Sequence, residues 1–76
     1  MAEQIQNALT ILRRREVERR TGLSRSSIYE RIASVDPDSA DPAFPRPIQI
    51  GGRAVGWLEH EVTAWITAQI EKSRKA

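Results

Sequence analysis

The stretch that decides the fold is RREVERRTGLSRSSIYERIA, residues 14–33. Its first part is a charged helical pattern in which Val17 points inward and Glu16 lies four residues before Arg20, a spacing that supports a helix. Gly22 suits the left-handed conformation just past a helix end, and Ser24 suits the N-cap of a new helix. The stretch therefore predicts a helix over residues 14–20, a tight turn and a second helix.

The apolar positions of the second helix indicate which of its faces is buried. Leu23, before the cap, and Ile28, at the fourth helical position, have the spacing of a hydrophobic staple. Ile28 and Ile32 are four residues apart, so they share one inward face, with Ser27 at its boundary. The side chains predicted to point outward are Arg25, Ser26, Tyr29, Glu30 and Ala33.

A β-hairpin is predicted over residues 48–57, where apolar residues alternate with other residues around the glycine pair at 51–52. A turn with an even number of residues places four side chains on one face of the hairpin. These are Ile48, Ile50, Val55 and Trp57. We therefore expect one apolar face packed on the core, with Arg53 at or beside the hairpin tip.

The remaining segments are predicted to be a loop and a last helix. Residues 34–43 contain two prolines and three aspartates, which predicts an exposed loop. Residues 58–72 carry apolar side chains at helical spacing, which predicts an amphipathic helix. The apolar positions are Leu58, Val62, Trp65, Ile66 and Ile70. We expect Trp57 and Trp65 to be core anchors.

The composition is that of one small domain. The chain has 76 residues, no cysteine and a net charge of +2, so its core must be held by packing alone. The first ten residues lack the apolar run of a signal peptide or anchor, and we expect no membrane contact. We divide the chain into a flexible N-terminal segment at 1–10, one domain at 11–72 and a basic C-terminal tail at 73–76.

Five pieces of sequence, in this order and spacing, resemble the AlpA-like regulators of prophages. They are residues 14–17, TGLSRSSIY at 21–29, FPRPI at 44–48, GGRAVGW at 51–57, and Glu61 and Val62 with Trp65. The resemblance covers residues 11–70. It implies a mainly α fold with a small β-hairpin, a winged helix-turn-helix of the MerR and excisionase type with three helices plus a wing.

The same resemblance implies binding of double-stranded DNA at promoter or attachment sites by a cytoplasmic, nucleoid-associated protein. Residues 24–33 correspond to the recognition helix, and residues 48–57 to the wing, with its tip at 51–54. Two departures are present. The loop at 34–43 is longer than in the shortest members, and Glu30 stands where many relatives have a basic or neutral residue. The base preference of the relatives is therefore not carried over.

Within this frame, the first turn of the recognition helix reaches base edges first, and Arg25 is best placed to grip a guanine. The residues expected to contact bases are Arg25, Ser26, Ser27 and Glu30. Those expected to contact the DNA backbone are Arg15, Arg19, Ser24, Tyr29, Arg46 and Arg53. Packing remains the alternative for Tyr29, and a merely solvated helix face remains the alternative for Arg15 and Arg19. A net charge of +2 is too small to bind DNA by charge alone, so DNA binding must depend on where the basic side chains are placed.

Other site chemistries are disfavoured by the sequence. The acidic run at 36–41 lacks the glycine and the distal glutamate of a calcium loop. Glu59 and Glu61 are two residues apart on a helix, so they do not form a carboxylate pair. His60, the one histidine, is expected to be solvated. We therefore expect no metal, no cofactor and no enzymatic activity.

Three functions remain open from the sequence. The leading hypothesis is a sequence-specific double-stranded DNA-binding transcriptional regulator of prophage or mobile-element genes. The first alternative is an excisionase, a recombination directionality factor that bends attachment-site DNA. The second, of another class, is a protein-interaction module that uses the helix at 58–70. Self-association on repeated sites and contact with an integrase are further partner expectations.

Overall fold

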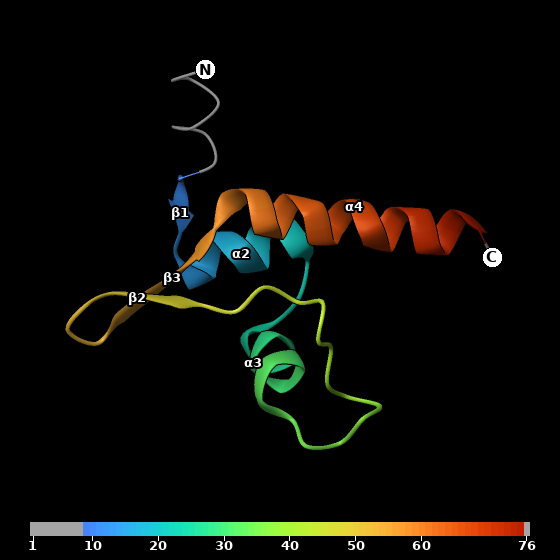
Figure 1. The fold of residues 1–76 in the computed structure, drawn as a ribbon, viewed down its shortest axis with the longest axis horizontal. Coiled ribbons are helices and arrows are strands. Elements are labelled where there is room, and N and C mark those ends of the chain that lie inside the picture. Colours follow the sequence, from blue (N-terminus) through green and yellow to red (C-terminus); the bar gives the residue numbers. More distant parts are fainter. Residues whose placement is uncertain (1–8, 76) are drawn as a thin grey trace.

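The computed structural model describes residues 9–75, which form the elements shown in Figure 1. In chain order these are β1 (Ile11–Leu12), α2 (Arg14–Thr21), α3 (Arg25–Ala33), β2 (Ile48–Gly51), β3 (Ala54–Leu58) and α4 (Glu59–Lys75). Three helices and a hairpin in these residues make a mainly α, winged helix-turn-helix, as the sequence predicts. Of the predicted flexible segment, residues 1–8 lie outside the described residues.

The turn between α2 and α3 has the predicted chemistry. Gly22 adopts the left-handed conformation with φ of 76°, and its N–H donates to the carbonyl of Glu18 at 2.8 Å. The Ser24 hydroxyl accepts a hydrogen bond from the N–H of Ser27 at 3.2 Å and so caps α3. The hydroxyl of Thr21 in turn accepts from the N–H of Leu23 at 3.2 Å. These local bonds confirm the predicted turn and fix where α3 begins.

The sheet contains a strand that the sequence pattern did not predict. In the order β1-β3-β2, the two residues of β1 pair antiparallel with β3, Ile11 opposite Leu58 and Leu12 opposite Trp57. A strand of two residues is too short to show the alternation by which strands are recognised. Leu58, predicted to open the last helix, is instead the last residue of β3.

The expected single apolar face of the hairpin is wrong. Gly52 and Arg53 form the turn, but a β-bulge between Gln49 and Gly51 shifts the register, so that Ile48 pairs with Gly56. Cross-strand partners share a face and neighbours alternate, so Ile48 lies on the face opposite Trp57. The extra residue of a bulge reverses the parity that a turn of even length sets.

The two faces of this small sheet consequently differ in burial. Trp57 is fully buried, and Val55 is partly buried against the core. Ile11, Ile48 and Ile50 remain 41%, 37% and 39% exposed. The core therefore contacts one side of the sheet, and the second side keeps an exposed apolar surface.

The core draws side chains from nearly every element. Its buried residues are Leu12, Val17, Ile28, Phe44, Trp57, Val62 and Trp65. Both tryptophans are in this set, which confirms their prediction as core anchors. Each ring also satisfies its N–H, Trp57 by donating to the carbonyl of Pro45 at 3.1 Å and Trp65 by donating to Oδ2 of Asp41 at 2.9 Å. The loop between α3 and β2 is thereby tied to the core.

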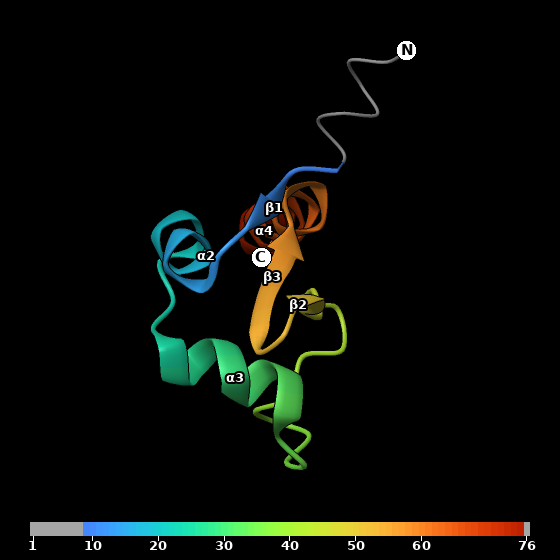
Figure 2. The same cartoon turned by 90° about the vertical axis from the view of Figure 1, so that its left-hand side faces the viewer.

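Helix α4 extends along one side of the molecule, with its C-terminal part reaching beyond the other elements in Figure 1, and Figure 2 shows α3 standing apart from it across the sheet. The helix continues through Lys75, whereas the sequence reading ended the domain at residue 72. Among the helices of residues 9–75, none is long and apolar enough to cross a lipid bilayer.

Candidate nucleic-acid interface

The outward face of α3 is polar and accessible. Arg25, Ser26 and Glu30 are exposed, whereas Ser27 is half-buried, as the sequence pattern predicts. Ser27 is also engaged locally, because its hydroxyl accepts from the Ser24 hydroxyl at 3.1 Å. Ser24 and Ser27 are therefore bonded to each other at the N-terminal end of α3.

Tyr29 links this face to the core. Its side chain is 37% exposed, and its ring meets Trp57 edge-on with centroids 6.3 Å apart. On the other side the Arg25 guanidinium lies 5.9 Å from the centre of the Tyr29 ring, within the range of a cation–π contact. Tyr29 thus packs against Trp57 and is also accessible to solvent, so packing and DNA contact are compatible roles for this residue.

Arginines from the start of α2 and from the hairpin tip meet beside Tyr29. They line a concavity of about 300 Å³, which we call the arginine hollow. Its lining residues are Arg13, Arg14, Arg15, Tyr29, Arg53 and Val55. The tertiary fold therefore brings together Arg15, Tyr29 and Arg53, which the sequence analysis had placed on the DNA backbone.

A second, more open concavity continues from the first. It shares Arg14 and Arg15 with the arginine hollow and is lined in addition by Glu18, Arg19 and residues 22–24. Arg19 and Ser24, two further predicted backbone contacts, thus lie next to the arginine hollow. A run of basic side chains extends from the hairpin tip along α2 toward the start of α3.

The acids of α2 engage some of these arginines and leave others uncompensated. Arg14 pairs with Glu18, and Glu16 accepts from Arg19 at 3.1 Å and from Arg20 at 3.2 Å. Within residues 9–75, Arg13, Arg15, Arg25 and Arg53 form no ion pair. These four arginines lie at the arginine hollow and at the first turn of α3. The other basic residues of the described chain that form no ion pair are Arg31, Arg46, Lys72, Arg74 and Lys75.

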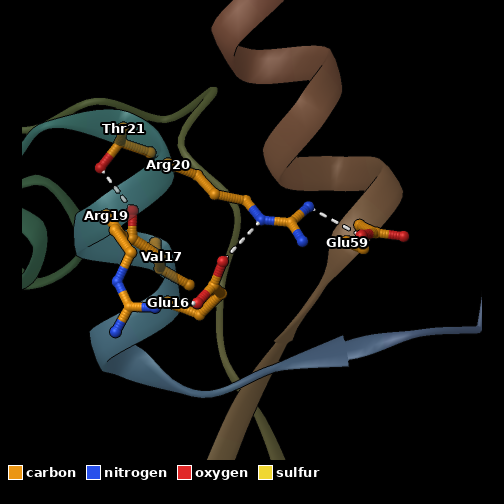
Figure 3. Close-up of polar contacts among 6 residues, drawn as sticks. All are labelled: Glu16, Val17, Arg19, Arg20, Thr21 and Glu59. Atoms are coloured by element: carbon orange, nitrogen blue, oxygen red, sulfur yellow. Dashed lines mark hydrogen bonds and ion pairs between the residues drawn. The ribbon is translucent and has the colours of Figure 1, made fainter.

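Arg20 has a structural role instead. Its Nη1 donates to Glu59 Oε2 at 2.7 Å, which joins α2 to the start of α4 (Figure 3). The hydrogen bonds that Arg20 donates to Glu59 and, to a lesser extent, to Glu16 raise its pKa above the ordinary value. Arg20 therefore holds two helices together on the side that Figure 3 shows, with Arg19 and Glu16 beside it.

Arg46 lies elsewhere. Its Nη1 donates to the carbonyl of Ile32 at 2.8 Å, at the C-terminal end of α3, and it lines a separate groove between residues 42–48 and α4. The structure does not bring it together with the other predicted backbone contacts. Conversely, sequence reasoning missed Arg13, although it directly precedes Arg14 and Arg15, because it falls before the helical pattern begins.

Metal chemistry finds no support in the part of the chain that the structure describes. Residues 9–75 contain no group of three or more His, Cys, Asp or Glu side chains placed to hold a metal ion. His60 is exposed near the start of α4, as expected. The arginine hollow is lined by four arginines, so its charge favours an anion over a cation.

Comparison with known proteins gives the family. Residues 10–70 match the model described as "Prophage CP4-57 regulatory protein (AlpA)". The chain belongs to the AlpA family of prophage regulatory proteins. The match spans every element from β1 to the first two-thirds of α4, and it includes the arginine hollow and the outward face of α3.

Two curated relatives resemble this AlpA-family chain. It is 34% identical over 61 residues to a protein of Escherichia coli (strain K12) named DNA-binding transcriptional activator AlpA, covering 80% of this chain and 86% of that protein. It is 44% identical over 59 residues to the uncharacterized protein ORF88 of Enterobacteria phage P4, covering 78% of this chain and 59% of that protein. No solved structure gives a significant match.

Proposed function

We propose that this chain is a sequence-specific, double-stranded DNA-binding regulator of transcription that acts on prophage or mobile-element genes. In this proposal α3 enters the major groove, and the hairpin at 48–57 contacts the backbone or the minor groove. The observation that carries it is the placement of uncompensated arginines from α2 and the hairpin tip beside the polar face of α3. The E. coli relative is named a DNA-binding transcriptional activator, which supports the same function.

The dimensions of a duplex suit this arrangement. The major groove is about 12 Å wide and admits one α-helix, whose N-terminal residues reach the base edges. Arg25 and Ser26 occupy the first turn of α3 and are exposed. We assign to Arg25 the reading of a guanine, and to Ser26, Ser27 and Glu30 further base contacts.

The backbone contacts in this proposal come from the basic run beside α3. Arg15, Arg19 and Arg53 are exposed, and Ser24 and Tyr29 border the same concavities. Contacts to phosphate fix the position of a protein on DNA but carry no sequence information. The net charge of +2 is small, so affinity depends on this local concentration of charge.

The proposal is tested by selecting bound duplexes from a random pool and measuring affinity for the selected site. Four to six phosphate contacts predict a slope of log affinity against log salt of about −4 to −5. A protein-interaction module predicts no salt-dependent affinity for DNA. A flat salt response on the selected duplex therefore contradicts the proposed function.

The roles of α3 and of the hairpin are separated by two matched variants. Arg25→Ala is expected to lose about 1–3 kcal/mol of discrimination between the selected site and a site with one altered base pair. Arg53→Ala is expected to weaken binding to both sites about equally. If both variants lose affinity uniformly, the assignment of α3 as the element that reads bases is wrong.

A further inference from the structure

The arginine hollow concentrates charge in a way that a merely solvated surface does not require. It is lined by four arginines from two separate parts of the fold. Arg13 is the N-cap of α2, Arg14 and Arg15 are its first two residues, and Arg53 lies at the turn of the hairpin. Only Arg14 among them is paired with an acid within residues 9–75, through Glu18. Like charges gathered in one concavity repel each other, and an anion in their midst removes that repulsion.

The chemistry of the lining selects the kind of anion. Guanidinium groups present planar pairs of N–H donors that match the oxygens of a phosphate group. Tyr29 and Val55 complete the lining. A volume of about 300 Å³ is enough for one phosphate group with part of its attached sugar.

The position of the hollow next to α3 indicates which molecule supplies the phosphate. Tyr29 belongs both to its lining and to α3, whose exposed face lies beside it, and the Arg25 guanidinium lies 5.9 Å from the centre of the same ring. A strand that borders a groove occupied by α3 therefore passes the hollow.

We propose that the arginine hollow binds a single phosphodiester group of the DNA strand beside α3, with Arg13, Arg15 and Arg53 as its ligands. This inference rests on the proposed function, and it adds Arg13 as a contact that sequence reasoning missed. Because the ligands come from α2 and from the hairpin, one phosphate joins both elements to the same point of the backbone. It thereby sets the register of α3 along the groove.

The test is a scan of the selected duplex in which each phosphate in turn is replaced by an uncharged methylphosphonate. For the unaltered chain, one position is expected to weaken binding roughly 10-fold or more, the size of a hydrogen-bonded contact to a charged group. For Arg13→Gln and Arg53→Gln, the penalty at that same position is expected to shrink at least about threefold, because each variant has already lost one of the three ligands of that phosphate.

Arg74→Gln is the matched control. Arg74 is an exposed arginine near the end of α4, outside the arginine hollow, so its loss removes the same charge. The methylphosphonate penalty is expected to be unchanged in this variant. Circular dichroism of all three variants checks that they remain folded.

The outcomes separate this inference from the function on which it rests. If the chain selects a duplex, but no single phosphate position has a smaller penalty in both Arg13→Gln and Arg53→Gln, the hollow is not a phosphate site and the proposed function stands. If Arg74→Gln reduces the penalty equally, the effect is one of general charge and the inference is wrong. If the unaltered chain binds no duplex even at low salt, both fail.

Discussion

Gly56 is the position at which the packing of β1 on β3 can be tested most directly. A methyl group added to Gly56 points at Cγ2 of Ile11 and at the carbonyl oxygen of Leu12, which lies 3.1 Å away. Cγ2 branches directly from Cβ, so it cannot move aside without a change of rotamer or of the backbone. The main-chain oxygen of Leu12 is held by the pairing of β1 with β3.

Gly56→Ala is therefore expected to lower the free energy of unfolding by about 1–3 kcal/mol, the usual cost of forcing an extra carbon into a packed site. The backbone of Gly56 does not have a positive φ, so the alanine is not strained by conformation and the loss is steric. For a domain of this size, the melting temperature falls by roughly 4–8 °C per kcal/mol. Thermal and urea unfolding followed by circular dichroism measure the loss.

Ile11→Ala provides the rescue. It removes Cγ2, and because Ile11 is 41% exposed the single variant is expected to lose little stability. In the Ile11→Ala background, Gly56→Ala is then expected to cost about 1 kcal/mol less than in the unaltered chain, a coupling within the range measured for residues in contact. Equal costs in the two backgrounds, or no loss in Gly56→Ala alone, refute the placement of β1 across Gly56.

Two further predictions concern the cap of α3 and the attachment of the loop. Ser24→Ala is expected to lose about 1 kcal/mol of stability in urea unfolding, whereas Ser24→Asp keeps the cap. Because Ser24→Asp places a carboxylate on the basic run, it is expected to weaken DNA binding. A stable Ser24→Asp variant that binds DNA normally contradicts a phosphate contact at this position. Asp41→Ala is expected to lose about 1–3 kcal/mol of stability in the same assay, because the N–H of Trp65 loses its acceptor. The control is Asp38→Ala in the same loop, which is expected to change stability by less than about 0.5 kcal/mol. Equal losses in the two aspartate variants contradict the role of Asp41.

The predictions that held depend on contacts between near neighbours in the chain. The left-handed Gly22, the cap at Ser24 and the inward Ile28 each follow from residues within a few positions of one another. The two tryptophans were placed correctly because their size and spacing leave few other environments. The outward face of α3 could be predicted for the same reason, since a helix fixes which side chains share a face.

The predictions that failed, or that no pattern could make, concern the sheet and its surroundings. The bulge beside Ile50 reversed the face of Ile48, and no residue in the hairpin marks that bulge without knowledge of the strand it pairs with. Strand β1 has two residues and exists only because β3 lies beside it. Nothing in the sequence indicated that Arg13 lines the arginine hollow, because the lining includes Arg53, forty positions later.

The amino-acid sequence by itself thus determined the helix-turn-helix, its cap and the polar face of α3, because these depend on helical periodicity and on bonds that span a single turn. Only the tertiary structure decided which arginines gather into one concavity and which, like Arg20 with Glu59, hold helices together. The physical reason is distance along the chain. Charges that are far apart in sequence become neighbours only after the core around Trp57 has fixed the hairpin against α2 and α3.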